Sequence, residues 1–324
     1  MTKFIGRLAD IGIAKEASRG TAETSVDFYL PKVSLSIDDG IEQAVDESSI
    51  GVIEDSPNAS VVAKYAEGEI EGNIYDKSFG LILLAALGDT TVSGPTETSV
   101  YTHTFSVLQS AQHPSLTLFF DDPNQDYKYP LAVLSSLELD FVLGQYARYT
   151  ASFRSKKGET ATLSPSYSAE NHFLPQHIAV QYATSVSGLA SPTTVNVRSA
   201  KITIEKNIED DRKLGSLDQA DILNKQLSVE GSLELVFDAE TFKTQMLADT
   251  SLALRIVATN SDVTIGSTLH PKLTITLAKV KFSNFERDFD NDGTVTATVD
   301  FKGHYSLGDT AMITAELVNT QASY

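Results

Sequence analysis

The sequence predicts a mainly β protein made of two tandem copies of one unit, each with a single short helix. The first observation is a strand, a turn and a helix at 69–88, where Ile70, Gly72 and Ile74 alternate with polar residues before an apolar stretch of helical spacing. The second is a similar arrangement at 227–249. The third is that most other segments alternate polar and apolar residues, as half-buried strands do. Two copies of this uncommon unit indicate an internal duplication.

Each unit is expected to place one helix on the face of a sheet. Asp76 and Asp238 stand where N-caps would stand, and Gly88 follows the first helix as a stop signal. The apolar residues of the two flanking helices are Phe79, Leu83, Leu87, Phe242 and Met246.

The predicted organisation has four parts. An irregular N-terminal arm (1–25) is broken by glycines, and a first β domain (26–157) follows it. A polar linker with two prolines (158–175) leads to a second β domain (176–324).

The two domains match in the order of their elements more than in their residues. Ile202 and Ile204 are aligned with Leu35 and Ile37, and the runs after each helix correspond in order and spacing. After the first strand of the first domain comes an acidic stretch of about twenty residues without a period, which predicts a long functional or disordered loop. Each domain would contain about seven strands, whose sheet edges must be covered or paired.

Composition excludes several classes of protein. The 324 residues include 43 acidic and 25 basic side chains, for a formal net charge of −18, which argues against a protein that binds duplex DNA through phosphate contacts. With no cysteine, neither disulfides nor thiolate metal sites are possible. The N-terminus resembles no signal peptide, and no segment is apolar enough to cross a bilayer, so we expect no membrane contact and synthesis in the cytoplasm of the producing cell.

One segment has the spacing of half a calcium loop. Asp288, Asp290, Asp292 and Gly293 match the first half of that pattern, but Val299 stands where its final acidic ligand belongs. A hairpin turn is the preferred interpretation, and a cation site is the alternative.

No constellation of catalytic residues is visible. The six histidines lack the spacing of metal ligands, and the chain has no phosphate-binding loop, nucleophile elbow or dinucleotide fingerprint. We therefore expect no cofactor and no enzymatic activity.

Most of residues 4–160 resembles the major tail tube proteins of long-tailed bacteriophages. The resemblance rests on the arm IGIAKEASRGTA, on FYLPKVSLSID, on the loop DESSIGVIEDS, on AEGEIEGNIYDKSFGLILLAALG and on YTHTFSVLQSAQHPSLTLFFDDP. Beyond the linker, only the internal repeat extends it.

The resemblance implies a fold and a function. Each domain would be a β-sandwich-like or barrel unit with a flanking helix, whose inner strands join those of neighbours in a ring-closed barrel. Most relatives place six single-domain chains in a ring, so a two-domain chain implies three, with pseudo-sixfold symmetry. At about four strands per domain, about 24 strands would enclose an aqueous channel, because barrel diameter grows with strand number.

The resemblance also implies contacts and partners. Two loops (40–62 and 206–224) would join stacked rings, and the N-terminal arm would lie on an adjacent subunit. The partners would be further copies of the chain, a tape measure protein inside the tube, and tail terminator and tail-tip or baseplate proteins. Genomic DNA would pass without specific binding, and the chain would be part of the virion after assembly in the host cytoplasm. The loop residues concerned are Asp46, Glu47, Ile50, Ile53, Glu54, Asp210, Asp211, Leu214 and Leu217, and those of the arm are Ile11, Lys15, Glu16 and Arg19.

Two function classes remain open on sequence alone. The first is a structural protein that polymerises into a DNA-conducting tube. The second is a monomeric β-sandwich that binds or decorates a capsid or cell surface, which would not self-assemble.

Overall fold

The computed structural model describes residues 3–324, and most of them lie in antiparallel strands. Two short α-helices are present, α1 (Phe79–Leu87) and α2 (Thr241–Leu247). Neither helix has the length and apolar character to cross a membrane. The strands in chain order are β1 (Asp10–Lys15), β2 (Phe28–Leu30), β3 (Lys32–Asp46), β4 (Asn58–Asn73), β5 (Gly88–Glu97), β6 (Val100–Val107), β7 (Leu116–Asp121), β8 (Tyr127–Val142), β9 (Arg148–Ser155), β10 (Glu159–Thr160), β11 (Ile178–Ala183), β12 (Thr193–Val195), β13 (Val197–Asp211), β14 (Asp221–Val236), β15 (Leu252–Thr259), β16 (Lys272–Asp288), β17 (Thr296–Gly303) and β18 (Ile313–Asn319).

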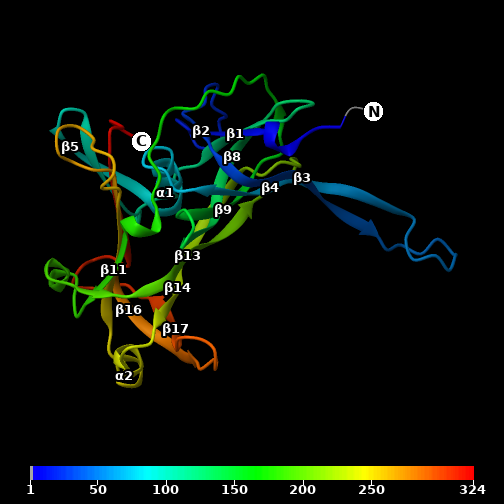
Figure 1. Cartoon of the computed structure of the whole chain (residues 1–324). Helices are drawn as coiled ribbons and strands as arrows, with labels where there is room; N and C mark the ends of the chain where they lie inside the picture. The colour runs from blue at the N-terminus through cyan, green and yellow to red at the C-terminus, as the bar shows by residue number, and fades with distance from the viewer. Residues whose placement is uncertain (1–2) are drawn as a thin grey trace.

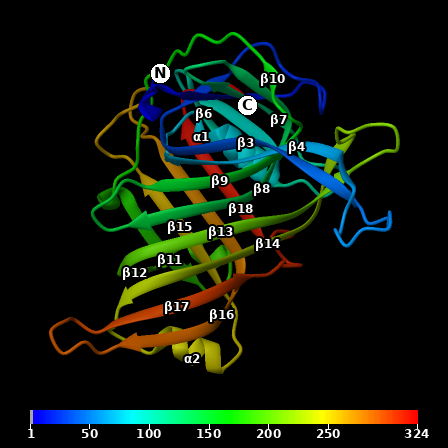
Figure 2. The ribbon, with the colours of Figure 1, turned by 90° about the vertical axis from the view of Figure 1, so that its right-hand side faces the viewer.

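Eight strands form one long antiparallel sheet in the order β3-β4-β9-β8-β13-β14-β17-β16, here called the long sheet. Figure 2 shows these strands as a ladder that descends from the blue β3 to the orange β16. The first four belong to the first repeat and the last four to the second. The repeats meet where β8 pairs with β13, and we call this pairing the internal seam. Among residues 3–324, the long sheet does not close on itself.

A second layer covers one face of the long sheet. In the first repeat it consists of β2, β1, β7, the N-terminal half of β8, and β10. In the second repeat it consists of β12, β11, β15, the N-terminal half of β16, β18, β6 and β5. Thus β8 and β16 each run through both layers. A register shift lies at the corner in each strand, at 134–136 and at 282–284, and such bulges bend a strand.

The strand order confirms the internal duplication. β1 to β4 correspond to β11 to β14, and β7 to β10 correspond to β15 to β18, with a helix after β4 and after β14. Only the first repeat contains a β5–β6 hairpin, and β6 crosses to pair with β18 of the second repeat. Since the repeats share hydrogen-bonded strands at two places, the domain boundaries 26–157 and 176–324 stay a prediction.

The residue-by-residue alignment of the repeats was wrong by two positions. Ile37 lies opposite Gly68, and Ile202 lies opposite Gly231, so Ile202 corresponds to Ile37 rather than to Leu35. A strand places side chains on alternate faces, so a shift of two residues preserves the pattern of polar and apolar positions. Alternation in the sequence therefore could not reveal the shift.

Each repeat carries a glycine opposite a phenylalanine in the neighbouring strand. Gly68 lies opposite Phe153, and Gly231 lies opposite Phe301. A Cβ on Gly231 would collide with the ring of Phe301 and with the carbonyl oxygen of Lys201. These glycines allow the aromatic ring and the adjacent backbone to approach the strand closely.

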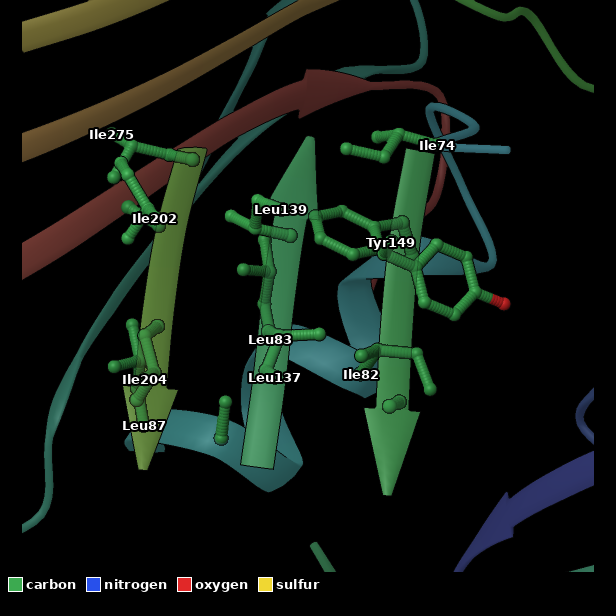
Figure 3. Packing of buried hydrophobic residues seen from close by; sticks show 14 of the residues in the cluster. Ile74, Ile82, Leu83, Leu87, Leu137, Leu139, Tyr149, Ile202, Ile204 and Ile275 are labelled. Carbon is green, nitrogen blue, oxygen red and sulfur yellow. The ribbon is translucent and has the colours of Figure 1, made fainter. Parts of the chain in front are cut away.

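Helix α1 lies inside the molecule, across the internal seam. All nine of its residues are buried. Figure 3 shows Ile82, Leu83 and Leu87 beside side chains of β8, β9 and β13, among them Tyr149 and Ile204. A helix that is apolar all round is typical of such a core position, in place of the one-sided stripe predicted from sequence. Leu83, Leu87 and Phe79 are confirmed as helix residues.

The predicted helix caps are corrected by the structure. Ser78 is the residue before α1, and its backbone N–H and hydroxyl donate to Glu170 of the linker. Asp76 instead accepts hydrogen bonds from the backbone N–H and side-chain amide of Asn171, and burial raises the pKa of the Asp76 carboxyl. Glu240, not Asp238, precedes α2. Gly88 does end α1 in the left-handed conformation.

The two helices differ in burial. In α2, Phe242 is buried and Met246 is half-buried, but Leu247 is 73% exposed. The end of α1, by contrast, is enclosed by the second repeat. Lys206 of β13 is buried there and donates from Nζ to the carbonyl oxygen of Ala85 at 2.9 Å. Burial and, to a smaller extent, the nearby Arg19 lower the pKa of Lys206 to about 7.

Gly231→Ala should destabilise the chain, because the new methyl group meets both Phe301 and a backbone oxygen. We expect the free energy of unfolding to fall by about 1–3 kcal/mol, measured by chemical denaturation. Gly293→Ala is the matched control, since its Cβ would meet no atom closer than 3.6 Å. Equal stability of the two variants would contradict the close packing described here.

Lys206 should make stability depend on pH. Its pKa is lower in the folded chain than in the unfolded chain, so the unfolded chain binds more protons between these two values. Stability must then increase as the pH rises from about 7 to about 9, by up to about 1.4 kcal/mol per unit. Lys206→Met should lose this dependence in denaturation curves recorded across that range. An unchanged slope in the variant would show that Lys206 is not its origin.

Candidate assembly surfaces

The face of the long sheet that points away from α1 is strongly acidic. Leu137, Leu139 and Ile204 point toward α1, so the residues between them point the other way (Figure 3). Cross-strand pairing places the other strands' polar residues on this same side. We call this surface the acidic face. Its carboxylates are those of Asp38, Glu67, Glu69, Glu71, Glu138, Asp140, Glu205, Glu230, Glu234, Glu286, Asp288 and Asp300, and between them lie Arg148, Arg154, Lys201 and Lys302.

Cross-strand ion pairs hold the cations of this face close to carboxylates. Lys201 Nζ lies 2.6 Å from Glu138 Oε1 across the internal seam, and Lys302 Nζ lies 2.6 Å from Glu230 Oε1. Desolvation and the neighbouring Glu138 raise the pKa of Asp140, while Lys201 opposes that rise. The basic side chains are therefore neutralised by partners, and the surplus carboxylates give the face a negative potential.

A two-stranded arm extends from one end of the long sheet. The segment 40–62, expected as a loop, is largely strand, because β3 continues to Asp46 and β4 begins at Asn58. Figure 1 shows this arm extending well beyond the rest of the molecule. Backbone hydrogen bonds between the two strands hold the arm in an extended conformation. The arm can therefore form strands although its sequence shows no alternation of apolar residues.

The tip of the arm carries apolar side chains in water. Ile50 is 67% exposed and Ile53 is fully exposed. Asp46, Glu47 and Glu54 lie beside them and are exposed as well. The Asp46 carboxylate accepts a hydrogen bond from the Ser48 backbone at 2.9 Å, and hydrogen bonds from Ser48 lower the pKa of Asp46. A group of exposed apolar residues with a polar border is typical of a protein contact surface.

The second predicted loop, 206–224, is placed differently. Its connecting residues fold back over the base of the arm, where Leu217 O accepts from Lys64 N at 2.8 Å. Arg212 forms a two-pronged ion pair with Glu42 of β3, at 2.5 and 2.6 Å. Leu214, in the loop between β13 and β14, is fully exposed.

Two acidic residues of this second loop were also predicted contact residues. Asp210 is paired with Arg154 at 2.8 Å within the chain, and Asp211 pairs in register with Asp221. The two loops are thus unequal, since only the first projects freely.

The N-terminal arm is bound by its own chain. Ile11 is buried in β1, and the buried Glu16 carboxylate accepts from Leu131 N at 2.7 Å. Arg19 forms an ion pair with Asp221 of the second repeat at 2.7 Å, and Lys15 Nζ reaches the carbonyl oxygen of the last residue at 3.4 Å. These contacts lie within one chain, and the expected contact of the arm with an adjacent subunit stays a prediction. The alternation of Ile11 and Ile13 was the signal for a strand here.

The aspartates at 288, 290 and 292 form a turn. β16 and β17 are joined there as a hairpin, and Gly293 N donates to the carbonyl oxygen of Asp290 at 3.2 Å. Within residues 3–324, no group of three or more acidic or histidine side chains is arranged to hold a metal ion. The prediction of a hairpin turn is confirmed.

Sequence reasoning missed the two unpaired edges of the long sheet. β3 pairs only with β4 among the described residues, and the C-terminal half of β16 pairs only with β17. The internal seam, between β8 and β13, joins strands far apart in the sequence, so alternation alone could not indicate which strands stay unpaired.

Comparison with known proteins identifies the family of the chain. The family model described as "Phage tail tube protein" matches residues 6–303. No curated protein sequence matches the chain. One solved structure, titled "Crystal structure of Hcp protein", is similar over 38% of this chain and 86% of its own, with 12% identity and a TM-score of 0.22. Since the family model spans nearly all of the chain, this protein belongs to the phage tail tube protein family.

Proposed function

We propose that the chain polymerises as stacked rings of three copies and forms the tube through which phage DNA passes. The observation that carries this proposal is the long sheet, which has two unpaired edges and one acidic face without a covering layer. Pairing of the edges between copies would remove both exposed edges at once. Membership of the family supports a structural part of the virion.

The number of strands supports a ring of three. One chain supplies eight strands to the long sheet, so three copies would supply about 24, enough for an open channel. The repeats would give such a ring pseudo-sixfold symmetry, because each has four strands in the long sheet. The contact between copies is head-to-tail, which closes a ring when the rotation suits it.

The acidic face would line the channel. The opposite face is occupied by α1, α2 and the second layer, so only the acidic face is free to border a lumen. Duplex DNA carries closely spaced phosphates, and each uncompensated cation on the wall would add affinity and slow transit. Ion pairs such as that of Lys201 with Glu138 would make the basic side chains less available for contacts with phosphate.

The projecting arm would join one ring to the next. Its apolar tip at Ile50 and Ile53 is exposed in the single chain and would be buried against a neighbouring ring. The loop 206–224 would support the base of the arm through Arg212 and Glu42. The tape measure, terminator and tail-tip partners stay predictions from the family resemblance.

Assembly of the purified protein tests this proposal. Negative-stain electron microscopy should show rings or tubes, and light scattering of the rings should give a mass of three chains. Six chains per ring would keep the tube but contradict the trimer. A chain that stays monomeric at high concentration, even after tail-initiation proteins are added, would favour a monomeric binding module.

Substitution at the arm tip should stop stacking. We expect Ile50→Asp with Ile53→Asp to shorten tubes to single rings or free chains, because two charges would be buried at the ring contact. Leu307→Asp is the matched control, since Leu307 is 87% exposed but lies between β17 and β18, away from the arm. Tubes of normal length from the arm variant in micrographs would contradict the assigned role.

Reversing charge on the acidic face should make tubes retain DNA. Glu69→Lys, Glu205→Lys and Glu234→Lys together alter carboxylates that form none of the face's ion pairs. Cosedimentation of short duplex DNA with variant tubes should appear at low salt and fall steeply as salt rises, by about one power of salt concentration per phosphate contact. Control tubes carry Asp89→Lys, Asp309→Lys and Glu316→Lys, three carboxylates that lie outside both the arm and the acidic face. Equal retention by both would show that the acidic face does not border the DNA path.

A further inference from the structure

The internal seam provides a template for the contact between two copies. In the seam, β13 pairs antiparallel with β8, with Ile202 opposite Leu139 and Ile204 opposite Leu137. The corresponding strands at the ends of the long sheet are β3 and β16. Both of these lack a partner on the matching side among residues 3–324. The same pairing can therefore be repeated between chains.

The repeats correspond residue by residue along these strands. Gly68 with Phe153 matches Gly231 with Phe301, and this fixes the alignment of the four central strands. The register shifts agree with it independently. They lie at 32–34 in β3 and 197–199 in β13, and at 134–136 in β8 and 282–284 in β16. The register shifts of the first repeat therefore fall at the same aligned positions as those of the second repeat, in both pairs of strands. This supports a single alignment of the two repeats.

We propose that β3 of a second copy adds to the open edge of β16 in the register of the internal seam. This inference rests on the proposed function and specifies its lateral contact. Transferring the pairs of the seam places Ser36 opposite Asp288, Ile37 opposite Arg287, and Asp39 opposite Phe285. The strands are antiparallel, and every pair keeps its side of the sheet.

Exposed apolar side chains on both surfaces support this contact. Inside the chain, the buried Lys206 reaches the C-terminal end of α1. The residue of β3 that corresponds to Lys206 is Ile41, which is 52% exposed. The exposed Leu247 is the last residue of α2, as the buried Leu87 is the last residue of α1. Docking would bring Ile41 to the end of α2 and cover both side chains with each other.

The contact between copies would be more polar than the internal seam. Within the chain, Leu131 and Val133 of β8 pack against Ile208 and Ile222 of the second repeat. The corresponding residues of β16 are Lys279 and Lys281, which would lie near the acidic base of the neighbour's arm. Charged residues keep an open strand edge hydrated before it finds its partner. They also give opposite charges across the contact, which orient association.

Disulfide trapping in assembled tubes tests the register. The chain has no cysteine, so introduced pairs have no background. Directly opposed residues of antiparallel strands have Cα atoms about 4.5–5.5 Å apart, within the range of a disulfide. Under oxidation, Ser36→Cys with Asp288→Cys should link neighbouring chains into products of up to three chains on non-reducing gels. Ser36→Cys with Glu286→Cys is displaced by two residues, or about 7 Å, and should link at least fivefold less.

A cysteine pair within one chain is the control for the oxidation reaction itself. Lys201→Cys with Asp140→Cys occupies the corresponding pair of the internal seam and should close within one chain without assembly. Asp39→Cys with Phe285→Cys is a second intermolecular pair, for use if the first pair disturbs assembly. If tubes form but the displaced pair links better, or neither in-register pair links, the register is wrong. If the unsubstituted chain forms no tubes, the proposed function fails instead, and linked products of six chains would contradict only the trimer.

Discussion

The structure depends on the pairing of β8 with β13. The internal seam joins the four strands that the first repeat contributes to the long sheet to the four strands of the second repeat. Helix α1 covers it from one side, and the Lys201–Glu138 ion pair crosses it on the other. Arg19, bound to Asp221, ties the N-terminal segment to the second repeat at the same boundary. Buried apolar side chains of both repeats belong to one cluster, so the repeats share a hydrophobic core.

One unit of sequence appears twice in different surroundings, and the difference explains the two helices. α1 is enclosed by residues of the second repeat, whereas α2 ends with the exposed side chain of Leu247. The same reasoning applies to the strand edges at β3 and β16. The exposed end of α2 and the open edge of β16 correspond to the enclosed end of α1 and the paired strand β8, which is the pattern expected of a unit that continues into another copy.

Charge is divided between the faces of the long sheet by the period of a strand. Successive residues of each strand point alternately into the core and onto the acidic face. The chain can therefore have a large apolar core and still carry an acidic surface along the whole long sheet. Basic side chains on the acidic face form ion pairs across strands, as Lys302 does with Glu230. The negative charge of the acidic face therefore comes from the whole long sheet and not from a single motif.

The sequence by itself determined the mainly β class, the duplication, the places of both helices and the turn at 289–295, because these follow from local periodicity and turn residues. The family resemblance also placed Ile50 and Ile53 in a loop expected to join stacked rings. Only the tertiary structure decided that this segment is strand, that Glu16 and Arg19 bind their own chain, and that Asp76 anchors the linker. It also decided the register between repeats, since a shift of two residues leaves alternation unchanged. Strand partners are chosen by contacts between residues distant in the chain, and no local pattern records which edge is left open.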